Sequence, residues 1–211
     1  MYYTNIDKVL TKHSDLSVVE YDSNHAPQRI IGDFIMNSSY ENVCFCKTYP
    51  IDVDLSDFPP KVKEVGNKIR SSYPHRYDSG ELCLEVPSRM KLICIESDKF
   101  DFEKWVNCFL VPYFFSYEFF KRYGRYPFGE RSHGESGILE YYTELFHLSS
   151  KQQTKGFLEQ VIRMKSYRGH HLCPCGSGQK IRDCHNKEVE MALQPLYKEC
   201  IKEDFSKRVG R

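Results

Sequence analysis

Four side chains that bind soft metal ions lie close together near the C-terminal end of the sequence. The segment 173–185 reads CPCGSGQKIRDCH: one residue separates Cys173 from Cys175, and His185 follows Cys184 directly. Thiolate and imidazole groups in two such pairs can converge on one tetrahedral ion, and the glycines between them allow a tight turn. The spacing therefore predicts a zinc site with four protein ligands, which has no open position and is structural.

The residues around this predicted zinc site fit its charge. Three thiolates outweigh the two positive charges of Zn²⁺, and Lys180 and Arg182 within the segment would offset the excess. His170 and His171 precede the first cysteine and are alternative ligands. We expect them to flank the site rather than to join it.

The segment 173–185 resembles the SEC-C motif, a zinc-binding tail found at the end of the bacterial SecA motor and on many unrelated proteins. The resemblance covers only this segment, and every signature position is present. It implies that Cys173, Cys175, Cys184 and His185 are the ligands. In that family the motif serves in docking or folding, so it implies no reaction.

Cys83 is the second candidate for chemistry. It lies in the stretch RYDSGELCLEVP, residues 76–87, directly after a Gly-Glu-Leu turn and between two leucines. A cysteine in such a place is either a small buried hydrophobe or a nucleophile held at the end of a turn. If it is a nucleophile, Leu82 and Leu84 would anchor the turn in the core while the thiol points outward. His75 is then either a structural histidine or a group that organises the loop.

Length and charge limit the class of protein. The 211 residues suit one medium domain with an appendage, and the formal net charge of +1 gives no reason to expect a nucleic acid or a membrane as partner. Pro112 and Glu118 interrupt the longest apolar run, 106–120, which is too short to span a bilayer comfortably. The sequence starts without the apolar core of a signal peptide. We therefore expect a cytoplasmic protein.

The cysteine content agrees with a reducing compartment. Nine cysteines, an odd number, favour metal binding or catalysis over a framework of disulfides. Five of them lie in apolar or helical surroundings and are expected to be structural: Cys44, Cys46, Cys94, Cys108 and Cys200.

The elements that must position Cys83 are a short helix over 5–13 and a run of strands. Alternating or β-branched stretches separated by short breaks are typical of an antiparallel meander. Paired prolines at 59 and 60 interrupt the ladder before its last strand. The predicted strands are 29–39, 42–49, 51–55 and 61–66. The fold class is therefore α+β, a sheet of about four strands packed on helices.

Helical periodicity dominates the rest of the chain after a turn-rich segment, 66–90. The predicted helices are 100–110, 112–124, 138–148, 151–167 and 187–203. We expect two regions: a main domain over 1–150, and a helical extension with the zinc segment over 151–211.

The order of these elements resembles the ubiquitin-conjugating enzyme fold. The paired prolines and the turn Gly80-Glu81-Leu82-Cys83-Leu84-Glu85 carry the resemblance, and His75 stands where that family has the histidine of its His-Pro-Asn element. Arg76 and Tyr77 replace the proline and the asparagine. The resemblance is closest to bacterial conjugating-enzyme-like proteins. The loop that contains His133 is similar to those that occur in antiphage CBASS operons, and the chain looks like their stand-alone members because it has no motif for an ATP site.

The resemblance implies an acyl transferase that works through a thioester. Cys83 would accept the C-terminus of a donor protein as a thioester and pass it to an amine, and the donor would be a cGAS-like nucleotidyltransferase (CD-NTase). Tyr77 stands where the family's oxyanion-stabilising amide would be, and His133 could approach the thiol from its glycine-containing loop. Three carboxylates are either solvated or orient an incoming lysine: Asp78, Glu85 and Glu130.

Two other functions stay open on the sequence alone. One is a binding module of the same fold without chemistry, and the other is a zinc-stabilised adaptor that recruits a partner and in which Cys83 is incidental. Retention of the thiol between two leucines favours the transferase. The sequence contains no G-x-G-x-x-G or P-loop motif. The donor carboxylate would therefore be activated elsewhere.

Overall fold

The computed structural model describes residues 2–205. The chain consists of two compact units, Met1–Gly129 and Glu130–Arg211, called here the first and second unit. The sequence pattern predicts a main domain that extends to 150. Residues from 130 onward group with the second unit because the helix Gly134–Leu145 packs on the next helix: the hydroxyls of Thr143 and Thr154 are 2.7 Å apart.

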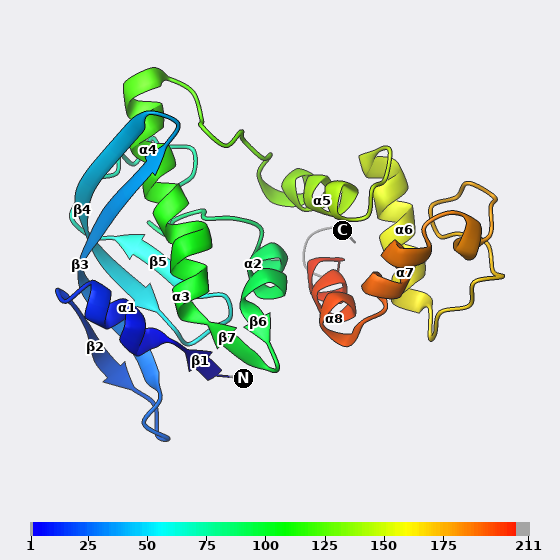
Figure 1. Ribbon diagram of the computed structural model, residues 1–211, viewed down its shortest axis with the longest axis horizontal. Helices are drawn as coiled ribbons and strands as arrows, with labels where there is room; N and C mark the ends of the chain where they lie inside the picture. The colour runs from blue at the N-terminus through cyan, green and yellow to red at the C-terminus, as the bar shows by residue number, and fades with distance from the viewer. Residues whose placement is uncertain (1, 206–211) are drawn as a thin grey trace. The chain divides into compact units, whose positions relative to one another are not determined.

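The first unit is built on a four-stranded sheet in which consecutive strands pair antiparallel (Figure 1). The predicted α+β class and meander are confirmed. The register runs from Arg29 opposite Asp54 to Tyr40 opposite Val43 across the two longest strands. The strands are β2 (Leu16–Tyr21), β3 (Pro27–Tyr40), β4 (Val43–Asp54) and β5 (Lys61–Glu64).

A long helical segment covers one face of this sheet (Figure 1). It comprises α3 (Phe102–Trp105), a π-helical turn (Val106–Leu110) and α4 (Val111–Tyr123). The π-helical turn precedes Pro112, whose missing N–H and bulky ring would disturb a regular ladder. Phe114 of α4 stacks on Tyr49 with ring centroids 4.1 Å apart, and Phe34 lies against it at 5.7 Å. These rings form the centre of the core.

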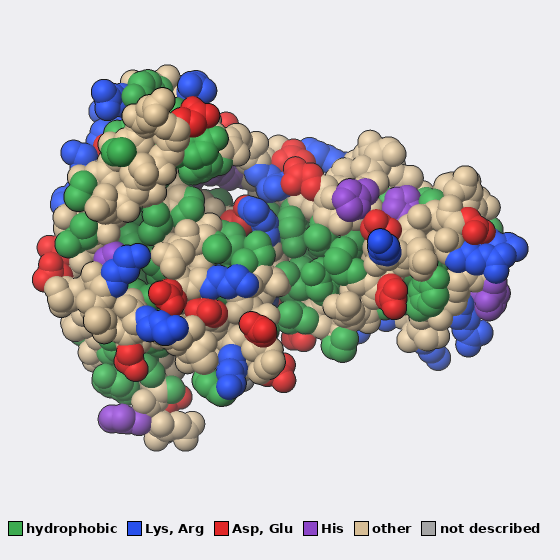
Figure 2. Space-filling model, viewed as in Figure 1, with side chains coloured by type: hydrophobic (Ala, Val, Ile, Leu, Met, Phe, Trp, Pro, Cys, Tyr) green, Lys and Arg blue, Asp and Glu red, His purple; other side chains and the backbone are tan. Residues whose placement is uncertain are grey.

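The remaining elements of the first unit are short. Strand β1 pairs in parallel with β7, which pairs antiparallel with β6, and α1 and α2 contact α3. Their bounds are β1 Tyr2–Thr4, α1 Ile6–Lys12, α2 Pro87–Cys94, β6 Ile95–Glu96 and β7 Lys99–Asp101. On the face of the first unit seen in Figure 2, basic and acidic side chains are interspersed, in keeping with the small formal charge.

The second unit is helical. A single helix was expected over 187–203, but the structure has two, because Pro195 starts a new helix. The buried hydroxyl of Tyr142 donates to Asp204 at 3.0 Å and joins the first helix of the unit to the last. The bounds are α5 Gly134–Leu145, α6 Lys151–Arg163, a 3₁₀ turn Ile181–Asp183, α7 Asn186–Ala192 and α8 Pro195–Asp204.

Across residues 2–205, every helix is too short or too polar to cross a membrane.

Candidate functional site

Cys83 lies in an irregular segment between β5 and α2, where the sequence placed it. The residue before it is fixed to the sheet, because the Leu82 amide donates to the Val62 carbonyl at 2.8 Å. Leu82 is buried and Leu84 is packed against the core, whereas Cys83 between them is half-buried. The two leucines therefore anchor the turn as expected.

A tight loop brings His75 next to Cys83. The Tyr77 amide donates to the Glu81 carbonyl, and the Gly80 amide donates to the Tyr77 carbonyl, both at 2.9 Å. Gly80 has a φ of +83°, a conformation that disfavours any side chain at this position. The Cys83 amide then donates to the His75 carbonyl at 2.8 Å, which closes the loop. A ring nitrogen of His75 lies within 4.8 Å of the Cys83 sulfur.

Aromatic side chains hold the His75 end of this loop. The Tyr113 hydroxyl donates to the His75 carbonyl at 2.9 Å, so this oxygen accepts from both Tyr113 and Cys83. Burial raises the pKa of Tyr113, with smaller contributions from Tyr73 and Cys83, which keeps its hydroxyl protonated as a donor. The His75 ring meets the Tyr126 ring edge to face, with centroids 5.1 Å apart. Sequence reasoning missed Tyr113, because nothing in its apolar run marks it as a donor to a loop.

The other predicted residues of the Cys83 site are placed as follows. The Tyr77 side chain is 49% exposed at the tip of the loop, and Asp78 beside it is exposed. Glu85 accepts from the Val86 amide at 2.9 Å and pairs with Arg89, so it is tied to the start of α2. This contact favours a structural role for Glu85 over the orientation of a lysine.

Two predicted residues belong to the second unit. His133 is the N-cap residue of α5 and is exposed, and Glu130 precedes it in an exposed loop. Their expected roles beside the thiol stay predictions.

The second site is a cluster of four ligand atoms in the second unit. Cys173, Cys175, Cys184 and His185 each offer one ligand atom, and these atoms all lie within 4.8 Å of one another. The sulfurs of Cys175 and Cys184 are 3.5 Å apart, and the Nδ1 atom of His185 is 3.1 Å from the Cys184 sulfur. These residues could hold a metal ion, and three thiolates with one imidazole are a donor set suited to zinc.

Backbone hydrogen bonds shape the loop that carries the first two ligands. The Cys173 amide donates to the Gln179 carbonyl at 2.8 Å, and Gly176 and Gly178 between them have positive φ angles of 78° and 76°. The Gln153 side chain of α6 donates to the Cys175 carbonyl at 3.0 Å. The loop is therefore attached to the helical part of its unit.

The ligand thiols differ in their affinity for protons. Burial raises the pKa of Cys173 to about 12. For Cys175 burial is the largest influence and acts in the same direction, but hydrogen bonds with Ser177, Cys173 and Cys184 together outweigh it and lower the pKa to about 7. His170 and His171 are exposed and pack edge to face on each other, with ring centroids 4.7 Å apart. The ligand cluster does not include them, as expected.

Comparison of the chain with protein-family models, with curated proteins and with solved structures finds no match. The functional conclusion therefore depends on the chemistry of these two sites. They lie in different units.

Proposed function

We propose that the chain is a ubiquitin-conjugating-enzyme-like transferase in which Cys83 carries the acyl group. The observation that supports it most is the Cys83–His75 pair: a half-buried thiol outside the strands, with a ring nitrogen within 4.8 Å. A transferable acyl group needs a thiol that is accessible and held in a defined place. The antiparallel meander with a helix across it is compatible with the ubiquitin-conjugating fold that the sequence resembles.

The proposed reaction has two steps. In the first, the Cys83 thiolate attacks the carbonyl carbon of an activated donor C-terminus; the C–S bond forms and the bond to the activating group breaks. In the second, an amine attacks the thioester carbonyl, an amide bond forms, and the thiolate leaves as the amine loses a proton to solvent or a nearby base. The activated donor is an acyl adenylate or a thioester on another protein, supplied by a separate enzyme.

The residues around Cys83 are proposed to position it. The carbonyl of His75 is held by two donors, Tyr113 and the Cys83 amide, so backbone movement at the thiol is restricted. This arrangement makes His75 a positioning residue. The exposed Tyr77 hydroxyl is proposed to donate to the oxyanion of the tetrahedral intermediate, in place of the family's amide.

The proposed donor is the C-terminus of a cGAS-like nucleotidyltransferase in a CBASS antiviral system, and the acceptor is a protein lysine or another amine. This assignment depends on the resemblance of the loop that contains His133 to those of conjugating-enzyme-like proteins in CBASS operons. The proposed role of the second unit is structural: one Zn²⁺ bound by Cys173, Cys175, Cys184 and His185 would hold the loop 173–185 in shape.

A non-catalytic adaptor is the second candidate. It is favoured by the placement of the metal cluster in a compact unit of its own, away from the sequence that carries Cys83. Incubation with the donor protein and its activating enzyme distinguishes the two functions. The transferase predicts a donor-sized adduct that survives non-reducing denaturation and disappears with thiol reductant. An adaptor would bind the donor without forming this adduct, and the transferase would then be wrong.

A further inference from the structure

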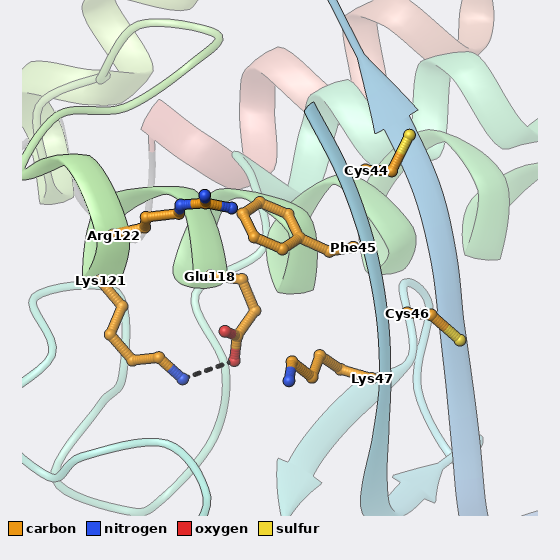
Figure 3. A pocket seen from close by; sticks show the side chains of 7 residues that line it. All are labelled: Cys44, Phe45, Cys46, Lys47, Glu118, Lys121 and Arg122. Atoms are coloured by element: carbon orange, nitrogen blue, oxygen red, sulfur yellow. Dashed lines mark hydrogen bonds and ion pairs between the residues drawn. The ribbon is translucent and has the colours of Figure 1, made fainter. Parts of the chain in front are cut away.

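A pocket of about 420 Å³ lies between the first half of β4 and the C-terminal turn of α4, and it contains none of the residues predicted to do chemistry (Figure 3). Three of its side chains are basic and one is acidic. Its lining residues are Cys44, Phe45, Cys46, Lys47, Glu118, Lys121 and Arg122. In Figure 3 the side chains of Cys44 and Cys46 point away from the pocket, so the polar groups facing it are the four charged ones.

The single carboxylate of the pocket is already neutralised. Glu118 is buried, with 8% of its side chain exposed, and one of its oxygens accepts from the Tyr49 hydroxyl and from the Lys121 ammonium, both at 2.8 Å. A buried carboxylate bound in this way keeps its partner in place, because separating the pair would leave an uncompensated charge. The paired side chains of Glu118 and Lys121 therefore form one wall of the pocket, which is held in place and has almost no net charge.

The other two cations have no such partner. Among residues 2–205, no carboxylate lies within 4.0 Å of the charged nitrogens of Lys47 or Arg122. Both side chains reach toward the pocket, Lys47 from the strand and Arg122 from the helix (Figure 3). The Arg122 guanidinium also lies over the Tyr123 ring, 5.3 Å from its centroid. Two cations that lack a carboxylate partner and face one hollow would attract an anion placed between them.

We infer that this pocket binds the phosphate group of a small soluble anion. A phosphate carries close to two negative charges at neutral pH, which matches Lys47 and Arg122, whereas a carboxylate carries one. The planar guanidinium of Arg122 can donate two parallel hydrogen bonds to phosphate oxygens, and Lys47 adds a point charge. The volume is within the range of small-molecule sites, so there is room for more than one phosphate group. This inference is independent of the reaction proposed for Cys83.

Inorganic pyrophosphate is a suitable probe, because it presents phosphate groups alone. We expect saturable binding to the whole protein by isothermal titration calorimetry, and shifts of the amide signals of 45–47 and 118–122 in NMR spectra. Lys47→Gln and Arg122→Gln should each weaken binding by about 10-fold or more, the loss expected for one charge-assisted hydrogen bond. Both side chains belong to exposed residues, so the variants should fold.

The matched control is Lys12→Gln, which removes the same charge from an exposed residue of α1 outside the pocket. It should bind pyrophosphate like the wild type. Two results would overturn the inference: no saturable binding to wild-type protein at millimolar pyrophosphate, or equal weakening by Lys12→Gln and Lys47→Gln, which would show an unspecific charge effect.

Discussion

The amide of Cys83 donates a hydrogen bond to the carbonyl of His75 at 2.8 Å, across a loop closed by a glycine of positive φ. The same carbonyl accepts from the Tyr113 hydroxyl. The carbonyl oxygen of His75 thus links the backbone of Cys83 to Tyr113 of α4. Two predictions concern this arrangement, and two concern the second unit.

The first prediction tests the thiol as acyl carrier. With donor and activating enzyme, Cys83→Ser should form an oxyester slowly, because a hydroxyl is the poorer nucleophile without a strong base beside it. That adduct should resist thiol reductant and yield to hydroxylamine. Cys83→Ala should form no adduct and still bind the donor, since only one sulfur is lost. Gel electrophoresis and mass spectrometry report both results. Conjugation by Cys83→Ala at the wild-type rate would contradict the proposed mechanism.

The second prediction assigns a positioning role to Tyr113. Tyr113→Phe should destabilise the protein by about 1 kcal/mol, the usual net value of one hydrogen bond, and should also change the alkylation rate of Cys83. Tyr117→Phe is the control, because its hydroxyl donates to the Lys68 carbonyl at 2.8 Å from the same helix. The control should lose similar stability in denaturant titration and keep the wild-type alkylation rate. Equal alkylation rates in the two variants would show that Tyr113 is only structural.

The third prediction concerns the metal. Elemental analysis should find one zinc per chain, and Cys184→Ser should lose it and unfold the loop 173–185 while the thiol of Cys83 still reacts. Because the pKa of Cys173 is raised to about 12, zinc must displace its proton at neutral pH. Zinc binding should therefore release protons and weaken as the pH falls. Calorimetry in buffers of different ionisation enthalpy measures this release, and a proton-independent affinity would contradict the ligand set.

The fourth prediction concerns acid stability of the second unit. Glu140 accepts from the Lys151 ammonium and from the hydroxyl and amide of Ser132, and these hydrogen bonds lower its pKa from 4.5 to about 2. Its stabilising contribution is therefore complete above pH 4.5 and is lost as the pH falls toward 2. Glu140→Gln should be less stable than the wild type at pH 6, and the difference should shrink at low pH.

Denaturation of the wild type and of Glu140→Gln at each pH measures the difference between their free energies of unfolding. Glu199→Gln, on an exposed residue of α8, is the control and should follow the wild type at every pH. A constant difference between Glu140→Gln and wild type from pH 6 to pH 2 would rule out the ionic contribution.

Features that are formed by residues close together in the sequence could be predicted from local patterns. The cluster of four candidate metal ligands and the turn at Cys83 are of this kind. Strand β2 was missed, and β4 was expected as two strands because Pro50 interrupts its pattern, yet Pro50 pairs with Asp33 inside one ladder. Cys44, Cys46 and Cys108 were expected to be structural, whereas all three are exposed.

Features that depend on distant parts of the chain could not be read from the sequence. Tyr113 is 38 residues from the carbonyl that it contacts, and Glu118 is 69 residues from Tyr49. Such pairs form only when α4 packs on the rest of the first unit, and no short window of the sequence contains both members. For the same reason the basic pocket has no signature in the sequence.

The short separation between the four candidate ligands has a consequence for the loop that carries them. All four lie between 173 and 185, and the entropy needed to close a loop of this length is small. Capture of the proposed ion would therefore need no distant part of the chain. In a cell short of zinc, the loop 173–185 would then be the part of the second unit that proteases cut first, while the helices around it stay folded.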